Sequence, residues 1–413
     1  MKMGQIGSEN EPDQSLPDQS SQDQSLQNGS SAGEQTSYHQ STGPSSPLSE
    51  KTHSTLTLAM LPGLGPRSLT ALLERFGDAK SVLSASAPEL GSVYGVGPKL
   101  VHTIRTASDH VDVSSIVRWC KENDTDIICR DDQNYPRMLE DLSDAPSVLY
   151  SRGEMLPEDQ LAVAIVGTRH ATSYGLRQAQ RFGHSLAKAG VTVVSGLARG
   201  IDGAAHEGAL DAGGRTIAVL GGGLGQMYPS EHAGLADAIA ADGAVISEYA
   251  PYAKPRGGMF PQRNRIIAGL SVATLVIEAP DRSGALITAR LAYEQNREVL
   301  ALPGPVTSRA SRGCNQLIRD GAKLVQTVDD ILEELGPVRE TVVSQGHEVR
   351  NPSELKLNEI ERQVLGAIEV TSTPIDEVIQ KSELPAHRVI AVISVLEMRR
   401  LVRRLSGQYV SRI

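Results

Sequence analysis

The sequence predicts an α/β fold, in which a Rossmann-like parallel-sheet core is flanked by a smaller module at each end. Three observations predict it. Short β-branched runs alternate with helical patterns over residues 113–335, as in a parallel sheet covered on both faces. Several of these runs lead directly into a glycine. The segments before residue 113 and after residue 335 show mainly helical patterns, without the regular alternation with strands. A chain of 413 residues is also long enough for two or three domains.

The N-terminal segment, residues 1–52, repeats Asp-Gln-Ser units among Ser, Gly, Pro and Glu and contains almost no large apolar side chains. Such a segment cannot bury enough apolar surface to offset the entropy of ordering, so we expect a disordered acidic tail. Residues 1–50 hold seven acidic residues and one lysine, a charge of −6, which leaves −3 of the total of −9 for the remainder. The overall charge therefore neither supports nor excludes a nucleic-acid partner.

Residues 53–112 contain two copies of one pattern, apolar-Gly-apolar-Gly-Pro-basic, at Leu61–Arg67 and at Val93–Lys99. Glycine allows a tight turn, and proline suits the first position of the helix that follows. The pair is typical of a helix-hairpin-helix (SAM-like) module. The amides of such turns can hold a phosphate, but these modules also serve as scaffolds, so DNA contact by this module stays an open alternative.

The core, residues 113–335, is expected to form a parallel sheet with helices on both faces. Ligands of open α/β sheets bind at the carboxyl ends of the strands, where the glycine-containing loops of this chain fall. The candidate strands are Asp126–Cys129, Ala162–Val166, Thr192–Ser195, Thr216–Leu220, Ala244–Ser247, Thr274–Ile277 and Glu298–Ala301.

Residues 336–353 are polar and read as a linker, and residues 354–413 predict a winged helix. Helical patterns at Leu357–Ile368, Ile375–Gln380 and Pro385–Arg400 precede an alternating segment that turns at Ser-Gly. From Arg388 onward there are six arginines and one glutamate, a local charge of +5. This surface could face duplex DNA, dock a partner or simply be solvated.

The segment Phe260–Ser271 predicts an anion site. It places Arg263, Asn264 and Arg265 directly before an apolar run, with Phe260 ahead of them. A guanidinium fits phosphate oxygens with two parallel donors, and it is costly to bury without a partner. The alternative is an ion-pair network inside the domain.

Other loops at strand ends are candidates for the same site. Gly167, Thr168 and Arg169 follow one strand, Ser195-Gly196 ends another, and Ser283-Gly284 begins a helix. Each can offer backbone amides or hydroxyls to a phosphate. The run from Leu220 to Gly225 lacks the spacing of a dinucleotide fingerprint, so we expect a close-packing turn and no nicotinamide cofactor.

Two further patterns have structural alternatives. Asp202 and His206 lie four residues apart on one helical face, where a catalytic pair is conceivable but a structural role is more common. The three cysteines show no paired spacing, which argues against disulfides and a zinc site and fits a reducing cytosol. The sequence has neither an apolar run of membrane-spanning length nor a signal pattern, so we expect a soluble, cytoplasmic protein.

These motifs, in this order, resemble the DNA-processing protein A family (DprA, also called Smf) over residues 55–413. The resemblance implies a bacterial, cytosolic protein that binds single-stranded DNA without enzymatic turnover. It implies loading of the recombinase RecA during natural transformation, homodimerisation through the Rossmann-like domain, no cofactor and no membrane partner. The matching segments are Ile165–Arg169, Ser195–Asp202, Phe260–Ser271, Ser283–Ala289 and Gly313–Ala322.

The resemblance also implies which residues hold the strand. Arg199 stands at a position that varies among relatives. Gly225 replaces a common Asp, and the basic residue that usually lies close before the Phe is displaced to Arg256. The expected strand-binding residues are Gly167, Thr168, Arg169, Ser195, Gly196, Arg199, Phe260, Arg263, Asn264, Arg265, Ser283 and Gly284.

An alternative function is a nucleotide-processing enzyme, because phosphoribohydrolases of the lysine-decarboxylase-like (LOG) group resemble this core in layout. Those enzymes need a Pro-Gly-Gly-x-Gly-Thr-x-x-Glu motif, whose acid acts on the glycosidic bond. The comparable loop here, Ala279–Ala285, has no such glutamate, so we expect no enzymatic activity.

Overall fold

The computed structural model describes residues 49–336, 357–369, 372–399, 401–405 and 408–412. Most of the predicted tail and linker lies outside the described residues. The described chain opens with helix α1 (Glu50–Ala59), whose N-cap Ser49 accepts a hydrogen bond from the Thr52 amide at 3.1 Å. Residues 50–52 are therefore helical, and the expectation that the disordered tail reaches residue 52 was wrong for them, because this cap stabilises the first turn.

The two repeated hairpins lie in a helical module with its own hydrophobic cluster, which includes Leu72 and Ile104. Gly63 and Gly95 occupy the same place in each hairpin, with φ of +84° and +83°, a conformation that side chains disfavour. As the pattern predicts, a proline then begins each following helix. The helices of the module after α1 are α2 (Pro66–Phe76), α3 (Ala79–Ser84), α4 (Ala87–Gly91) and α5 (Pro98–Arg105).

A nine-stranded sheet forms the core, in the order β1-β2-β6-β5-β4-β3-β7-β8-β9. The seven strands from β6 to β9 run parallel, whereas β2 pairs antiparallel with both β1 and β6. All seven predicted strands are present, while β2 and the two-residue β9 were not predicted. The bounds are β1 Thr125–Cys129, β2 Val148–Gly153, β3 Ala162–Gly167, β4 Thr192–Ser195, β5 Thr216–Val219, β6 Ala244–Ser247, β7 Ala273–Ile277, β8 Glu298–Ala301 and β9 Lys323–Leu324.

The strand order reverses beside β3. From β3 the chain moves outward through β4, β5 and β6, and it then returns to place β7 on the other side of β3. The loops after β3 and β7 therefore diverge to opposite faces of the sheet. Such a switch point leaves a crevice at the carboxyl ends of the two strands.

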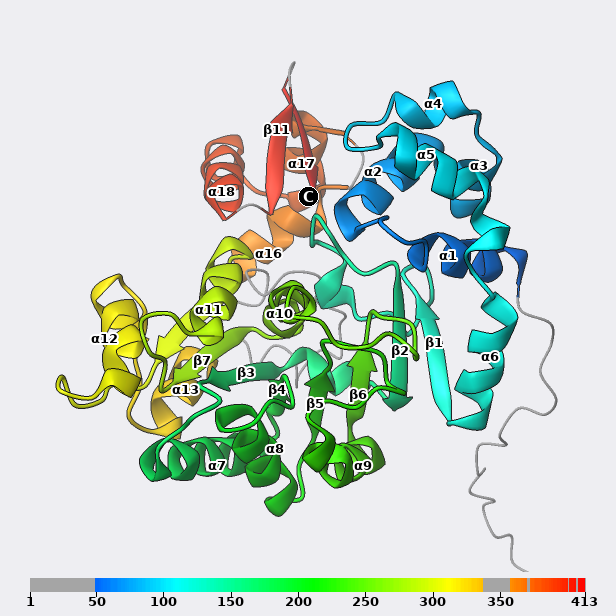
Figure 1. Ribbon diagram of the computed structural model, residues 1–413. Coiled ribbons are helices and arrows are strands. Elements are labelled where there is room, and N and C mark those ends of the chain that lie inside the picture. The colour runs from blue at the N-terminus through cyan, green and yellow to red at the C-terminus, as the bar shows by residue number, and fades with distance from the viewer. Residues whose placement is uncertain (1–48, 337–356, 370–371, 400, 406–407, 413) are drawn as a thin grey trace, which may run out of the picture. The chain divides into compact units, whose positions relative to one another are not determined.

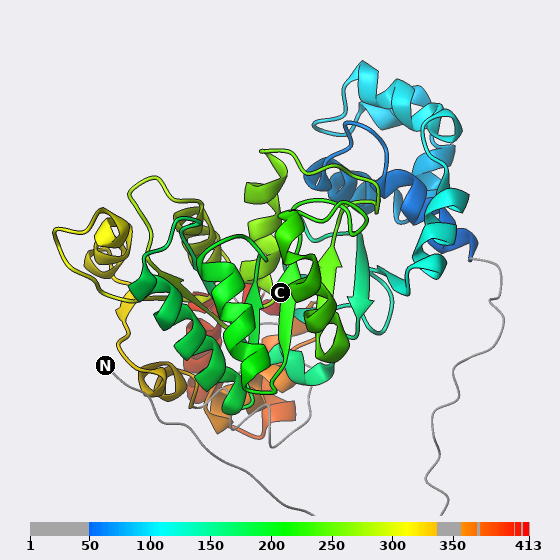
Figure 2. The same ribbon diagram turned by 60° about the horizontal axis from the view of Figure 1, so that its bottom comes forward.

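Helices cover both faces of this sheet, as Figure 1 shows. The helices α7 (Ser173–Lys188), α8 (Ile201–Asp211) and α9 (Ala233–Asp242) lie on one face and come forward in Figure 2. On the opposite face lie α10 (Met259–Gly269), α11 (Gly284–Glu294) and α12 (Arg312–Arg319). Strand β3 alternates between the layers, since Val163 and Ile165 pack with α7 and α8 while Ala164 and Val166 pack with α10 and α11. The remaining core helices are α6 (Val113–Glu122) and α13 (Val328–Glu334), with short 3₁₀ turns at Ala107–Asp109, Arg137–Leu139, Pro157–Gln160, Ser230–His232 (η4) and Arg309–Ser311.

The C-terminal residues confirm the predicted winged helix. Helices α16 (Glu359–Gly366), α17 (Ile375–Ser382) and α18 (Ala386–Met398) pack around one hydrophobic cluster that includes Val364 and Ile393. The wing consists of β11 (Val402–Leu405) and β12 (Tyr409–Arg412), and β12 also pairs with a short strand, β10 (Thr373–Pro374), that was not predicted.

The three cysteines are buried and unpaired, and burial raises the pKa of the Cys129 thiol to about 12. No helix in the described segments has the length and apolar character to cross a membrane. Within the same segments, no cluster of three or more His, Cys, Asp or Glu side chains could hold a metal ion.

Candidate functional site

A cavity of about 550 Å³ lies at the carboxyl ends of β3 and β7, where the strand order reverses. This volume is within the range of about 300–1,000 Å³ that small-ligand sites occupy. Four segments line it: the loop after β3, the start of α8, the first turns of α10, and the loop that leads from β7 into α11. Eight expected residues come together here: Gly167, Thr168, Arg169, Phe260, Arg263, Asn264, Ser283 and Gly284.

Arg169 and Phe260 form a cationic and aromatic wall of the cavity. The guanidinium carbon of Arg169 lies 4.9 Å from the centroid of the Phe260 ring, a cation–π distance. Arg169 is exposed and Phe260 is half-buried. The Phe260 ring packs directly against Gly221. A Cβ at that position would lie only 2.6 Å from the ring, so glycine is what leaves room for this contact. The run from Leu220 to Gly225 thus serves as the close-packing turn that the sequence predicted.

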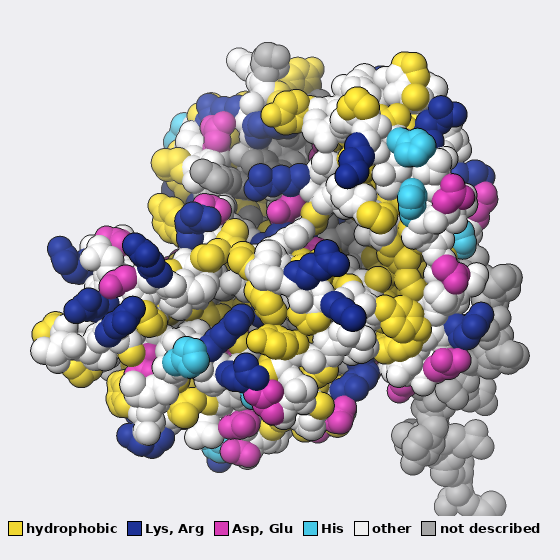
Figure 3. Space-filling view, viewed as in Figure 1, with side chains coloured by type: hydrophobic (Ala, Val, Ile, Leu, Met, Phe, Trp, Pro, Cys, Tyr) yellow, Lys and Arg dark blue, Asp and Glu magenta, His cyan; other side chains and the backbone are white. Residues whose placement is uncertain are grey.

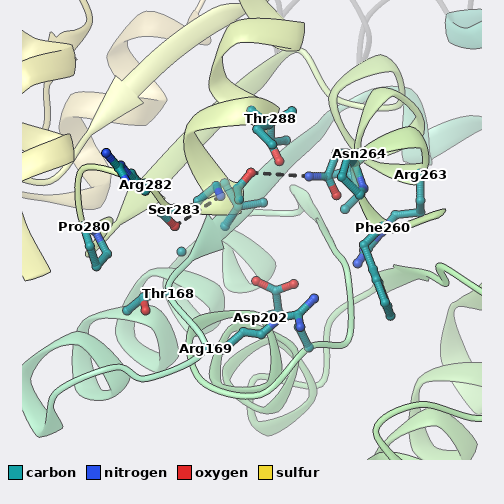
Figure 4. Close-up of a pocket in the computed structure, with 18 of the residues that line it drawn as sticks. Thr168, Arg169, Asp202, Phe260, Arg263, Asn264, Pro280, Arg282, Ser283 and Thr288 are labelled. Atoms are coloured by element: carbon teal, nitrogen blue, oxygen red, sulfur yellow. Dashed lines mark hydrogen bonds between the residues drawn. The ribbon is translucent and has the colours of Figure 1, made fainter. Parts of the chain in front are cut away.

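The opposite wall is the N-terminus of α11 and the loop before it, seen facing Phe260 in Figure 4. Ser283 caps the helix, and its Oγ accepts from the Ala285 amide at 3.3 Å. The Asn264 side chain donates to the Gly284 carbonyl at 3.4 Å and so links α10 to this turn. A helix N-terminus attracts anions, and the exposed Arg282 adds a full positive charge.

The floor of the cavity holds the buried side chains of Asp202 and Arg263, which are 7% and 3% exposed. Arg263 Nη1 donates to the Val219 carbonyl at 2.8 Å, and burial lowers the pKa of Arg263 to about 10. Burial also raises the pKa of Asp202, while Arg263 opposes that rise. The floor therefore pairs opposite charges, so the excess positive charge lies at the rim.

Arg265 does not reach the cavity. Its guanidinium is 3% exposed, with Nη2 2.6 Å from Glu248 Oε2 and Nε 3.4 Å from Asp144 Oδ1. It leaves α10 on the side away from Phe260 and joins that helix to the segment after β6. For this residue we correct the expectation of strand contact, because the geometry favours the alternative of an ion-pair network inside the domain.

Ser195, Gly196 and Arg199 also lie outside the cavity lining. Ser195 is fully buried, and its hydroxyl donates to the Ile165 carbonyl within the sheet. Gly196 supports the floor, because a Cβ there would overlap Arg263 Nη1. Arg199 is exposed and pairs with Glu231. The first two residues thus shape the site from below, and direct strand contact by them is not supported.

The other candidates for chemistry have structural partners. Glu278 accepts hydrogen bonds from the backbone amide and hydroxyl of Thr172, at the N-terminus of α7. Asp202 lines the cavity, whereas His206 is buried beneath it and contacts the Thr216 hydroxyl at 2.7 Å. Asp202 and His206 therefore do not face a common ligand, which favours the structural alternative for that pair.

Taken together, the rim can hold a phosphate and the interior can hold a base. A phosphate placed on the floor would meet the Asp202 carboxylate, whereas at the rim it would meet Arg169, Arg282 and the start of α11. The Phe260 ring offers a surface for stacking. Figure 3 shows that Lys and Arg side chains also gather over α12, at the left of the view. Helix α12 lies on the same face of the sheet as α10 and α11, which line the cavity.

Sequence analysis did not assign two residues of the cavity lining, Arg282 and Asp202, nor Tyr228, an aromatic neighbour of the cavity. Arg282 directly precedes the matching segment Ser283–Ala289 and was not assigned, although a basic residue just before a helix N-terminus is a usable signal. Asp202 was considered only with His206. Tyr228, whose ring centroid lies 5.7 Å from that of Phe260, had no sequence signal, because the loop after β5 meets α10 only in the folded chain.

Known proteins resemble this chain over most of its length. The family model for DNA recombination-mediator protein A matches residues 126–336, and the model for the DprA winged helix domain matches residues 348–408. Protein Smf of Synechocystis is 39% identical over 297 residues, which is 71% of this chain and 74% of that protein. Protein Smf of Escherichia coli is 38% identical over 308 residues, covering 72% and 80%. The solved structure of DNA processing protein A from Streptococcus pneumoniae matches with a TM-score of 0.60 and 34% identity, covering 68% of this chain and 95% of that one.

Proposed function

This chain belongs to the DNA recombination-mediator protein A family, and we propose that it binds single-stranded DNA in the cavity at the β3/β7 switch point. The observation that carries the proposal is the Arg169 guanidinium over the Phe260 ring, opposite the N-terminus of α11. One wall offers stacking and charge, and the other offers an anion site. A single strand needs both, and a duplex would keep its bases stacked away from Phe260.

The strand contacts in this proposal come from the residues that line the cavity. Arg169, Arg282 and the first turn of α11 take phosphates at the rim, while Phe260 and Asn264 meet the base. Arg263, Arg265, Ser195 and Gly196 support these contacts from beneath. Such binding is independent of sequence and weakens as salt rises, because phosphate contacts release counterions.

The wider role that we propose is a recombination mediator of natural transformation, which protects incoming single strands and loads the RecA recombinase. In this role the protein acts in the cytoplasm as a homodimer. Few aromatic side chains line the cavity, so contact per subunit is short, and two linked sites would gain affinity through effective concentration. Domain bounds of 53–112, 113–335 and 354–413 remain part of this proposal.

We propose further that the protein is not an enzyme. Glu278, the glutamate closest in sequence to the loop Ala279–Ala285, is engaged with Thr172 rather than facing the cavity. A carboxylate so held cannot act on a glycosidic bond inside the cavity. Absence of base release from nucleoside monophosphates would agree with this, and turnover lost in Glu278→Gln would contradict it.

The binding site is tested by fluorescence anisotropy with a labelled oligothymidylate. Arg169→Ala and Phe260→Ala should each weaken binding about tenfold, the scale expected for loss of one stacking or charged contact. Arg177→Ala is the matched control, because Arg177 is an exposed arginine on α7 outside the cavity lining. Equal affinities for Arg169→Ala and Arg177→Ala would overturn the assignment.

A further inference from the structure

A row of two aromatic rings with a guanidinium at each end leads out of the cavity. The Arg169 guanidinium lies over Phe260 at 4.9 Å, the Phe260 and Tyr228 ring centroids are 5.7 Å apart, and the Arg199 guanidinium lies over Tyr228 at 5.8 Å. Tyr228 does not line the cavity and is 43% exposed. The row therefore continues the cationic and aromatic wall onto the surface near η4.

We propose that Tyr228 and Arg199 form a second nucleotide subsite, which takes the base and phosphate next to the nucleotide in the cavity. This inference depends on the proposed binding of single-stranded DNA. Tyr228 supplies a ring for the second base, and Arg199 supplies the charge for its phosphate. Every base has a π-face, so the subsite does not discriminate sequence.

The inclination of the rings indicates how the two nucleotides lie. The Phe260 and Tyr228 ring planes are inclined by 51°, so bases stacked flat on the two rings cannot be parallel to each other, as neighbouring bases of a duplex strand are. Bases on these rings are therefore splayed from each other, each stacked on its own side chain. A duplex, whose bases stay stacked on one another, cannot use both rings.

Arg199 is held in place by an exchangeable partner. Its Nε is hydrogen-bonded to Glu231 Oε1, and the two side chains are 50% and 48% exposed. That hydrogen bond lowers the pKa of Glu231 and so favours its charged form. Exposed ion pairs contribute little stability. A phosphate can therefore replace Glu231 as the partner of Arg199.

The purely structural explanation is that Tyr228 and Arg199 only brace the loop after β5. Under that explanation, Tyr228→Ala would change thermal stability. Removing a base at any one position of the strand would then affect binding to the variant and to wild type equally. Base-by-base measurement separates the two explanations. The binding strand is oligothymidylate in which one nucleotide at a time is replaced by an abasic unit.

With wild-type protein, we expect two adjacent positions at which an abasic unit weakens binding about tenfold, or about 1.4 kcal/mol. With Tyr228→Ala, one of these positions should become insensitive, and the intact strand should bind about tenfold more weakly. Tyr228→Phe keeps the ring and should restore both sensitivities. Identical abasic profiles for wild type and Tyr228→Ala would overturn the subsite.

A second variant tests the exchange of partners. Glu231→Gln removes the competing carboxylate and should tighten binding of the intact strand, whereas Arg199→Ala should weaken it and lower its salt dependence. Unchanged affinity in both variants would overturn the role of Arg199. If wild-type protein shows no abasic-sensitive position and no binding at all, it is the proposed function that fails; a single sensitive position leaves that function standing and refutes only this subsite.

Discussion

At the scale of single residues, the site depends on one glycine beneath one arginine. Arg263 occupies the floor because Gly196 has no side chain, and its guanidinium reaches the Val219 carbonyl through that space. The sequence displays Gly196 beside Ser195 at a strand end, which resembles an exposed amide site. Only the fold reveals that its neighbour is a buried guanidinium.

Gly196→Ala should therefore lower stability by about 1–3 kcal/mol, the usual cost of overpacking. A Cβ at this position overlaps Arg263 Nη1 and forces the guanidinium away from Val219 and out of its buried position. Urea unfolding measures the change. Gly234→Ala is the control, since Gly234 is in α9 with nothing within 4 Å of the position that a Cβ would take, and alanine there should be neutral or stabilising. Equal stability of the two variants would contradict the close fit.

His206 is a second residue whose role becomes clear only in the fold. The Thr216 hydroxyl donates to the Val193 carbonyl at 2.7 Å, so it must accept from His206, whose Nδ1 therefore carries the proton. Its Nε2 is buried and has no hydrogen-bond partner among the described residues. A second proton on this ring would have no acceptor, and burial lowers the pKa of His206 from 6.5 to about 3.

This pKa makes folding stability depend on pH. Between pH 6.5 and about 3 the unfolded chain binds a proton at this position that the folded chain excludes, so stability falls as the pH is lowered through that window. The loss has an upper bound of about 1.4 kcal/mol per pH unit. His206→Gln keeps a donor for Thr216 and should show a shallower decline in unfolding free energy between pH 6.5 and 5 than wild type. Parallel declines would refute the assignment.

At the scale of elements, helix α10 separates two roles that its sequence places side by side. Phe260 and Asn264 face the cavity, while Arg265 turns to Glu248 and Asp144. Residues two positions apart on a helix lie about 200° from each other, so Arg263 and Arg265 cannot share one ligand face. The sequence reveals the cluster of hydrogen-bond donors on α10. Which of these donors bind a ligand and which stabilise the fold depends on the side of α10 that packs against the segment after β6, and only the structure shows that side.

Arg265→Ala should accordingly destabilise the fold by about 3–5 kcal/mol, because it leaves the Glu248 carboxylate buried without its cation. Adding Glu248→Ala should recover part of this loss, since the double variant contains no unpaired buried charge. Chemical unfolding of wild type, the two single variants and the double variant completes the cycle. If Arg265→Ala is as stable as wild type but binds the strand more weakly, Arg265 instead belongs to the ligand site.

The elements of the core were more predictable than the site. Thr192–Ser195, Ala244–Ser247 and Glu298–Ala301 have the predicted bounds, because short runs rich in apolar and β-branched residues define buried strands well. The sequence did not predict β2, because Val148–Gly153 ends in polar residues and pairs antiparallel with its neighbours. It did not predict β9, because that strand has only two residues. The convergence of the loops was predicted from their places at the strand ends, whereas the side of each loop or helix that faces the cavity is not contained in any local pattern.

At the scale of the whole molecule, hydrophobic packing divides the described chain into separate cores. The two large clusters beneath and above the main sheet contain only residues from 128 to 335, and the winged-helix cluster contains only residues from 357 to 410. No cavity-lining residue among those the structure describes belongs to the winged helix. Several arginines of that domain also have partners: Arg404 contacts Glu397 and Ser394, and Arg399 contacts Glu361.

These separate cores lead to a prediction for truncation after residue 336. The shortened protein should keep its affinity for single-stranded oligothymidylate within about threefold, because independent units contribute additively. Its salt dependence should also be unchanged, since the phosphate contacts of the cavity remain. Anisotropy at several salt concentrations measures both quantities, and the full-length protein with Arg169→Ala shows what loss of a cavity contact looks like.

If the winged helix instead carries strand contacts, truncation will weaken binding and flatten the salt slope together. If it faces duplex DNA, only binding to a double-stranded oligonucleotide will fall.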